Sequence, residues 1–152
     1  MARRAENTVN EMKCVFPAKS INEGLARMTV AAFIAQLDPP VSVLSELKTA
    51  VSEAVTNCIV HAYRHRTDKM KCPIYISAVY TGSGVLRITV KDKGTGITDV
   101  ALARTPLYTT DAEGERSGMG FTVMESFTDR VRVRSAQGKG TTVILEKRFD
   151  VK

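Results

Sequence analysis

The sequence predicts an α/β protein, because stretches that alternate apolar and polar residues are interleaved with two long segments of helical periodicity. Alternation is clearest in residues 11–17, 72–91 and 130–149, where it indicates strands. Helical periodicity runs through residues 20–37 and 42–66. With 152 residues, of which 43% are hydrophobic and 25% charged, the chain has the size and composition of one globular domain.

The first strand is expected at residues 11–17, where Met12, Cys14 and Phe16 alternate with charged or exposed positions, as in an edge strand. The polar residues 1–10 are expected to form a flexible N-terminal extension. A single domain should then cover residues 11–150.

Two helices are expected next. The first begins at Ser20, and Glu23 completes a capping-box pattern three residues later. The second begins with a cap at Ser42 and continues to about Arg66. Its apolar stripe should face the core and contains Leu44, Leu47, Val51, Ala54, Val55, Cys58 and Ala62.

Glu53 and Asn57 lie one turn apart in the second helix, so their side chains should face the same way. Both lie outside the apolar stripe, as does His61, so only a groove or solvent can face them. Polar pairs at this spacing are common on solvated helix surfaces, and the pair alone is weak evidence for a site. For His61 the two readings are a pocket-wall residue and an ordinary polar helix residue, and we favour the second.

Asp92 is expected to point to the covered side of the sheet, because it continues the alternation of apolar residues in the strand before it. Burial of an unpartnered carboxylate there would be costly. Gly94 and Gly96 follow, and glycine permits a ligand to approach the backbone closely. An ionised carboxylate only accepts hydrogen bonds, so the pattern suits a ligand amine such as adenine N6. A plain β-turn is the alternative at this stage.

A second glycine-rich stretch, residues 117–121, opens a predicted helix over residues 118–128. Free N–H groups at such a helix start can hold phosphates, and Arg116 and Ser117 add a cation and a hydroxyl. The preceding segment, residues 105–117, is long and polar enough to be a lid. Thr98 is expected to cap a short helix before it. The sequence has no P-loop motif, and the glycines come too late in the chain for a dinucleotide-binding fingerprint.

The composition narrows the class of protein further. The three cysteines, Cys14, Cys58 and Cys72, show neither CxxC pairing nor zinc spacing, which favours reduced thiols in a cytoplasmic protein. No apolar run is long enough to span a membrane, and the N-terminus lacks a secretory signal. The net charge of +6 is scattered and aromatic residues make up only 6%, so we expect no direct nucleic-acid binding.

The polar pair of the second helix suits phosphate chemistry. Magnesium takes only one or two protein oxygens and completes its shell with phosphates and water, so the Asn57 carboxamide could serve as its ligand. Glu53, one turn earlier, could accept a proton from an attacking hydroxyl or water.

Four motifs together carry a family resemblance: SEAVTN at 52–57, DKGTG at 92–96, SGMGF at 117–121 and GTT at 140–142. With these motifs, and with longer matches such as ARMTVAAFIAQLDP and ITDVALARTPLYTT, the sequence resembles the GHKL superfamily from about residue 11 to residue 149. It is most similar there to the anti-sigma factors of endospore-forming bacteria that act as serine protein kinases. The resemblance implies a two-layer α/β sandwich of the Bergerat type, with a mixed, mostly antiparallel sheet and helices on one face.

The resemblance also implies a role for each site residue. Glu53 would be the general base, Asn57 the ligand of Mg²⁺, and Asp92 the adenine anchor. Other residues would bind ATP, and Arg116 would also act in catalysis: Gly94, Gly96, Thr109, Thr110, Arg116, Ser117, Gly118, Met119, Gly120, Phe121 and Thr141. Arg27 would contact partners, although a solvated arginine is the alternative reading.

The implied partners are a sporulation sigma factor, which the protein would inhibit, and an anti-anti-sigma factor, whose serine it would phosphorylate. A homodimer is also implied, in which the first strand and helix supply the contact. The competing hypothesis is an ATP-gated anti-sigma protein without significant kinase activity.

Overall fold

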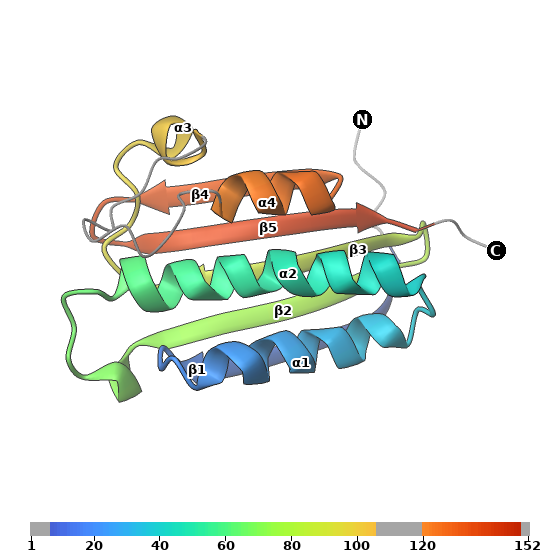
Figure 1. Ribbon diagram of the computed structural model, residues 1–152, viewed down its shortest axis with the longest axis horizontal. Coiled ribbons are helices and arrows are strands. Elements are labelled where there is room, and N and C mark those ends of the chain that lie inside the picture. Colours follow the sequence, from blue (N-terminus) through green and yellow to red (C-terminus); the bar gives the residue numbers. More distant parts are fainter. Residues whose placement is uncertain (1–6, 106–119, 150–152) are drawn as a thin grey trace.

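The computed structural model describes residues 7–105 and 120–149. Within these residues, a five-stranded sheet in the order β1-β2-β3-β5-β4 forms one layer. Helices α1, α2 and α4 lie side by side across one of its faces (Figure 1). The strands are β1 (Thr8–Pro17), β2 (Pro73–Thr81), β3 (Val85–Asp92), β4 (Arg130–Ala136) and β5 (Gly140–Arg148). The helices are α1 (Asn22–Ala35), α2 (Val41–Asn57), α3 (Val100–Ala103) and α4 (Gly120–Phe127).

The expected two-layer α/β class is confirmed, and every pairing between the five described strands is antiparallel, without the parallel pair of a mixed sheet. The connections explain this arrangement. Between β1 and β2 the chain runs out along α1 and returns along α2, so β2 begins opposite Pro17, where β1 ended. Hairpins join β2 to β3 and β4 to β5.

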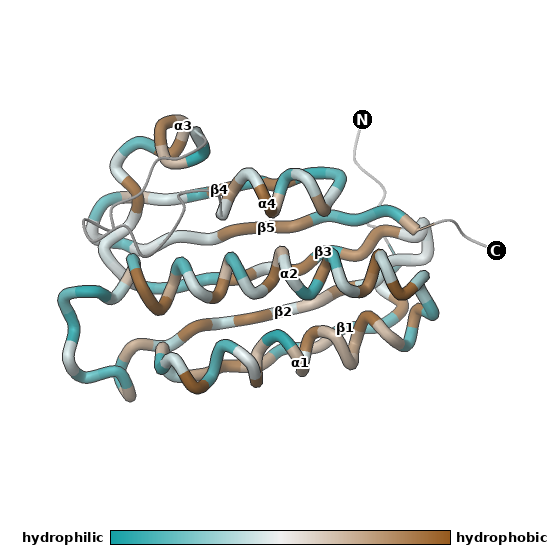
Figure 2. The backbone as a smooth tube through the Cα atoms, viewed as in Figure 1, coloured by the Kyte–Doolittle hydropathy of each residue, from teal (hydrophilic) through white to brown (hydrophobic). Residues whose placement is uncertain are grey.

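The core lies between the sheet and the helices. Alternate residues of the central strands point into it, among them Ile76, Ile88 and Leu145, which are all at most 2% exposed. Apolar residues accordingly concentrate in the central strands and recur along the helices (Figure 2). The predicted stripe of α2 is confirmed, with these members fully buried: Leu47, Val51, Ala54, Val55 and Cys58. In the described part of the chain, no helix combines the length and apolarity needed to cross a membrane.

The predicted helix caps at Ser20, Ser42 and Thr98 are wrong. No side chain caps α1, because the Glu23 carboxylate bonds to Arg27 and to Ser52 instead of closing a capping box. Ser42 lies inside α2, which starts after Pro40. The short helix α3 is capped by Asp99, whose side chain accepts a hydrogen bond of 3.0 Å from the Leu102 amide.

The second helix also ends differently from the prediction. The α-helix stops at Asn57, and the chain continues as one π-helical turn over Cys58–Ala62. Such turns often mark functional sites. Here the carbonyl of Ala62 accepts a hydrogen bond of 2.9 Å from the Thr95 amide, which ties the helix end to the loop after β3.

The first strand starts earlier than predicted. β1 begins at Thr8, inside the segment expected to be a flexible N-terminal extension.

Candidate active site

Glu53 and Asn57 lie on α2 opposite the start of α4. Both side chains are half-buried. A Cβ atom on Gly120, the first residue of α4, would lie 3.2 Å from Oε2 of Glu53 and 3.6 Å from Nδ2 and Oδ1 of Asn57. A carboxylate and a carboxamide therefore meet the N-terminus of a helix, whose free N–H groups favour an anion.

Asp92 ends β3 and points to the helix side of the sheet, as the alternation predicted. It is only 4% exposed. Its Oδ1 accepts hydrogen bonds from the amides of Gly94, at 2.9 Å, and Thr141, at 3.1 Å. Burial raises the pKa of the Asp92 carboxyl, although these donors and the Cys58 thiol act in the opposite direction. Its Oδ2 lies 3.5 Å from the Cys58 sulfur and accepts no other hydrogen bond from the described residues.

The glycines after Asp92 are required by close backbone contacts. A Cβ on Gly94 would lie 2.2 Å from the carbonyl oxygen of Ala62. Gly96 has a φ of 76°, and a Cβ there would lie 2.2 Å from the carbonyl oxygen of Ala136. The loop is thus packed between the π-helical turn that follows α2 and the turn that joins β4 to β5.

Thr141 is buried beside Asp92, and its hydroxyl lies 2.8 Å from the hydroxyl of Ser135 on β4. Ser135 also accepts a hydrogen bond of 2.6 Å from the Ile97 amide. Ser135 was not predicted as a site residue, although its position two residues after Val133 in an alternating strand places it on the helix side of the sheet. It connects the loop after Asp92 to the strand pair that carries Thr141.

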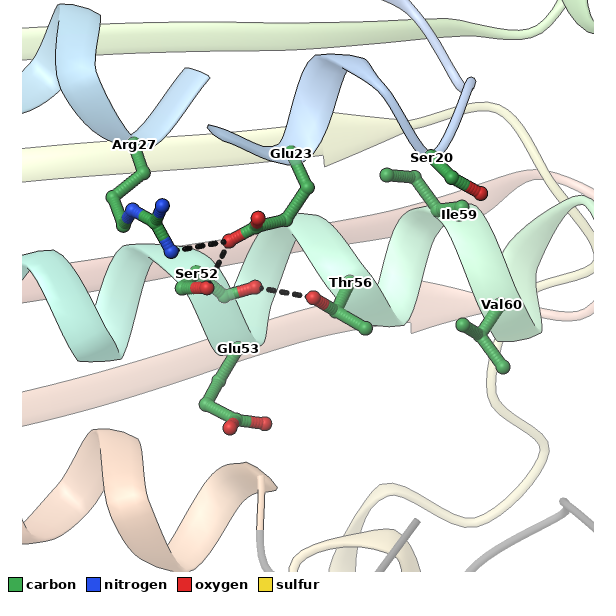
Figure 3. A pocket seen from close by; sticks show the side chains of 8 residues that line it. All are labelled: Ser20, Glu23, Arg27, Ser52, Glu53, Thr56, Ile59 and Val60. Atoms are coloured by element: carbon green, nitrogen blue, oxygen red, sulfur yellow. Dashed lines mark hydrogen bonds and ion pairs between the residues drawn. The ribbon is translucent and has the colours of Figure 1, made fainter. Parts of the chain in front are cut away.

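A polar groove of about 390 Å³ separates α1 from α2 on the outer surface. Its lining residues are Ser20, Glu23, Arg27, Ser52, Glu53, Thr56, Ile59 and Val60. Arg27 and Glu23 form an ion pair of 3.2 Å at the α1 side (Figure 3). Glu53 belongs to the lining but points away from α1, towards α4 (Figure 3). Its carboxylate thus lies between the groove and the start of α4.

The other predicted site residues are partly or fully buried, or lie outside the described part of the chain. The Phe121 side chain is 8% exposed and packs in the core. His61 is half-buried in the π-helical turn. The following predicted lid residues lie outside the described part of the chain: Thr109, Thr110, Arg116, Ser117, Gly118 and Met119.

The donor set for a metal is sparse. Among the described residues, no group of three or more His, Cys, Asp and Glu side chains is placed to hold an ion. A magnesium ion at Asn57 would therefore depend on ligand and water oxygens for most of its shell, which is the usual arrangement for this ion. The half-buried carboxamide beside the start of α4 fits that requirement.

Three features of the site agree with one domain family. They are a carboxylate at the end of a strand, a glycine loop packed on a helix end, and a polar pair that faces the start of a second helix. The sequence pattern of the histidine kinase-like ATPase domain matches residues 16–147. A solved structure of the RsbU and RsbW domains of a Mycobacterium tuberculosis protein supports this fold. It matches with a TM-score of 0.66 and 23% identity. The match covers 92% of this chain and 32% of that one. The fold and the site together thus define a histidine kinase-like ATPase domain of the GHKL type.

Curated relatives narrow the class further. The chain is 54% identical over 138 residues to the anti-sigma F factor of Geobacillus sp. (strain WCH70), covering 91% of this chain and 92% of the relative. The anti-sigma F factor of Clostridium perfringens (strain SM101 / Type A) is 50% identical over 141 residues, with 93% and 98% covered. The chain belongs to the anti-sigma F factor family.

Proposed function

We propose that this protein binds a sporulation sigma factor and inhibits it, and that it phosphorylates a serine of an anti-anti-sigma antagonist with ATP. The observation that carries the kinase proposal is the position of Glu53. Its carboxylate lies beside Asn57, close to the start of α4, and the residue also belongs to the lining of the groove between α1 and α2. A base in that position can face the phosphate site and a docked hydroxyl at once.

The nucleotide would be held at two places. Asp92 would accept a hydrogen bond from the adenine amine, with Thr141 beside it, and Gly94 and Gly96 would let the backbone approach the ring. The N–H groups at the start of α4 would bind phosphate oxygens. Asn57 would hold a magnesium ion, which when bound neutralises part of the phosphate charge.

In the proposed reaction, Glu53 takes the proton of the substrate serine as its oxygen attacks the γ-phosphorus. The bond between the γ-phosphorus and its bridging oxygen breaks, leaving ADP and a phosphoserine. Most catalysis of phosphoryl transfer comes from positioning and charge stabilisation. We assign part of that charge stabilisation to Arg116, together with the other lid residues beyond the described part of the chain.

The groove between α1 and α2 supports a docking role for this face. It is lined mainly by polar side chains, and the Arg27–Glu23 ion pair lies on the side away from α4. A polypeptide bound along it would bring a serine hydroxyl towards Glu53. Arg27, whose side chain is 39% exposed, would contact this partner.

The proposed homodimer would use β1 and α1. β1 is an edge strand, and apolar side chains on both elements are more than half exposed, including Val15, Leu25 and Met28. Association would remove these side chains from water. The proposal further places the protein in the cytoplasm.

The decisive experiment mixes the purified chain with γ-labelled ATP, Mg²⁺ and the anti-anti-sigma protein encoded in the same genome. We expect label on a serine of that protein, and loss of at least about 100-fold in transfer rate for Glu53→Gln, because general bases contribute factors of this order. Nucleotide affinity and sigma-factor capture should remain within about twofold of wild type, since Glu53 acts only in chemistry.

Thr49→Ala, a change one turn before Glu53 on the same helix, is the matched control, because the Thr49 hydroxyl bonds only to the carbonyl oxygen of Ser45 among the described residues. Sigma capture that depends on ATP, without labelling of any serine, would instead establish the gated-binding alternative. Unchanged transfer by Glu53→Gln would show that another group is the base.

A further inference from the structure

The two oxygens of the Asp92 carboxylate have different partners. Oδ1 is occupied by two backbone N–H donors, those of Gly94 and Thr141. Oδ2 has one partner among the described residues, the Cys58 thiol, whose sulfur is 3.5 Å away. Since Oδ1 is already occupied, Oδ2 is the oxygen left for a ligand amine.

The thiol proton has two possible acceptors. The Cys58 sulfur also lies 3.5 Å from the carbonyl oxygen of Ala54, one helical turn earlier. That carbonyl already accepts the backbone N–H of Cys58, as usual in a helix. A carboxylate is the stronger acceptor, because hydrogen bonds to ionised groups are stronger than those between neutral groups. The Cys58 thiol therefore donates its proton to Oδ2 of Asp92.

We propose that Cys58 is a positioning residue of the nucleotide pocket, whose thiol holds Oδ2 of Asp92 in the orientation that receives the 6-amino group of ATP. A carboxylate oxygen has two lone pairs, so Oδ2 can accept from the thiol and from the amine together. Without the thiol, the carboxylate plane has a fixed partner only at Oδ1. This inference rests on the proposed role of Asp92 in adenine binding.

The surroundings of Cys58 fit a donor better than a nucleophile. The residue is 3% exposed, and it directly follows Asn57, so the helix that presents the polar pair also places the thiol against Asp92. A buried cysteine behaves as a weak S–H donor, whereas a reactive thiol is partly exposed.

The test removes the partner groups on both sides of the interaction. ATP is compared with purine riboside triphosphate, which lacks only the 6-amino group, for binding to wild type, Cys58→Ala, Cys58→Val and Cys58→Ser. Wild type should prefer ATP. The two variants without a donor should lose roughly threefold to tenfold of that preference, the value of one ordinary hydrogen bond. Cys58→Ser, which keeps a donor, should retain most of it.

Cys72→Ala is the matched control, because Cys72 is also buried but its thiol bonds to the carbonyl oxygen of Asp68. It should leave the preference unchanged. If Cys58→Ala and Cys58→Val weaken both nucleotides equally, the residue only packs and the inference is wrong. If wild type itself shows no preference for ATP, the adenine role of Asp92 fails as well, and labelling of the antagonist then decides the kinase proposal separately.

Discussion

Gly120 and Glu53 lie so close that a single methyl group on Gly120 would come within 3.2 Å of the Glu53 carboxylate. They belong to different helices, α4 and α2, and their approach brings the start of α4 against the polar pair. Glycine at position 120 is thus explained by the limited space beside the Glu53 carboxylate. Its helical position alone would favour alanine.

Gly120→Ala is therefore expected to separate function from stability. The added methyl should displace Glu53 or the start of α4 and lower phosphate transfer about tenfold or more, since small misplacements of reacting groups cost this much. The melting temperature should stay equal or rise, because alanine is the better helix former. Gly24→Ala in α1, where the nearest atom is 3.7 Å away, is the control. Full transfer activity in Gly120→Ala would contradict the assigned geometry.

Asn57→Ala should weaken ATP binding mainly when magnesium is present. If the carboxamide is the protein's ligand to the ion, its loss should raise the Kd for ATP about tenfold with Mg²⁺, and much less with a chelator. Titration calorimetry under both conditions measures the difference. An equal loss with and without the metal would mean that Asn57 contacts the nucleotide directly.

Asp92→Asn should weaken ATP binding and should increase stability relative to wild type as the pH rises. Because burial raises the pKa of Asp92 above its ordinary value of 3.8, the folded state holds this proton more tightly than the unfolded state. That contribution favours folding at low pH and is lost as the pH rises through the folded-state pKa. The stability of Asp92→Asn relative to wild type should therefore increase as the pH rises from about 4.

Urea unfolding across this pH range provides the measurement. The same variant should bind ATP at least about tenfold more weakly at neutral pH, because an ionised acceptor is lost. A relative stability that falls as the pH rises would contradict the buried, penalised carboxylate.

Glu146 provides the opposite pH dependence on the helix-free face of the sheet. It accepts from Arg87 at 3.2 Å and from Arg132 at 2.7 Å. Burial of the carboxyl opposes the effect, but the two arginines prevail and lower the pKa of Glu146 below its ordinary value of 4.5. Its stabilisation is complete above the unfolded-state pKa and is lost as the pH falls through the lowered folded-state pKa.

Glu146→Gln should accordingly cost about 1–2 kcal/mol of unfolding free energy at neutral pH, and less below about pH 4.5. Glu125→Gln breaks a single, more exposed pair with Arg104 and should cost under about 1 kcal/mol. Denaturant titrations at both pH values compare the variants. Equal costs for the two changes would show that the double pairing adds nothing.

Periodicity was sufficient to predict the parts of the site that depend on one element alone. The alternation along β3 correctly predicts that the Asp92 side chain points to the helix side of the sheet. The apolar stripe of α2 correctly predicts that Glu53 and Asn57 lie outside the core. These are properties of a strand or a helix that persist whatever packs against it.

Contacts between distant segments could not be predicted in this way. The capping box at Ser20 failed because Glu23 found partners in Arg27 and in Ser52 of another helix. The helix through Cys58–Ala62 became a π-helical turn where the loop after β3 packs against it. Cys58 was correctly placed in the core, but its periodicity could not reveal that Asp92 lies beside it.

The sheet consists of an edge strand and two hairpins that are local in sequence. Asp92 ends one hairpin, and Thr141, 49 residues later, is the second residue of β5 in the other. The pocket between them exists only when β3 and β5, two segments distant in sequence, are paired. A nucleotide bound there would add its binding free energy to the joining of the two hairpins. ATP would then act as a folding ligand of this chain as well as its substrate.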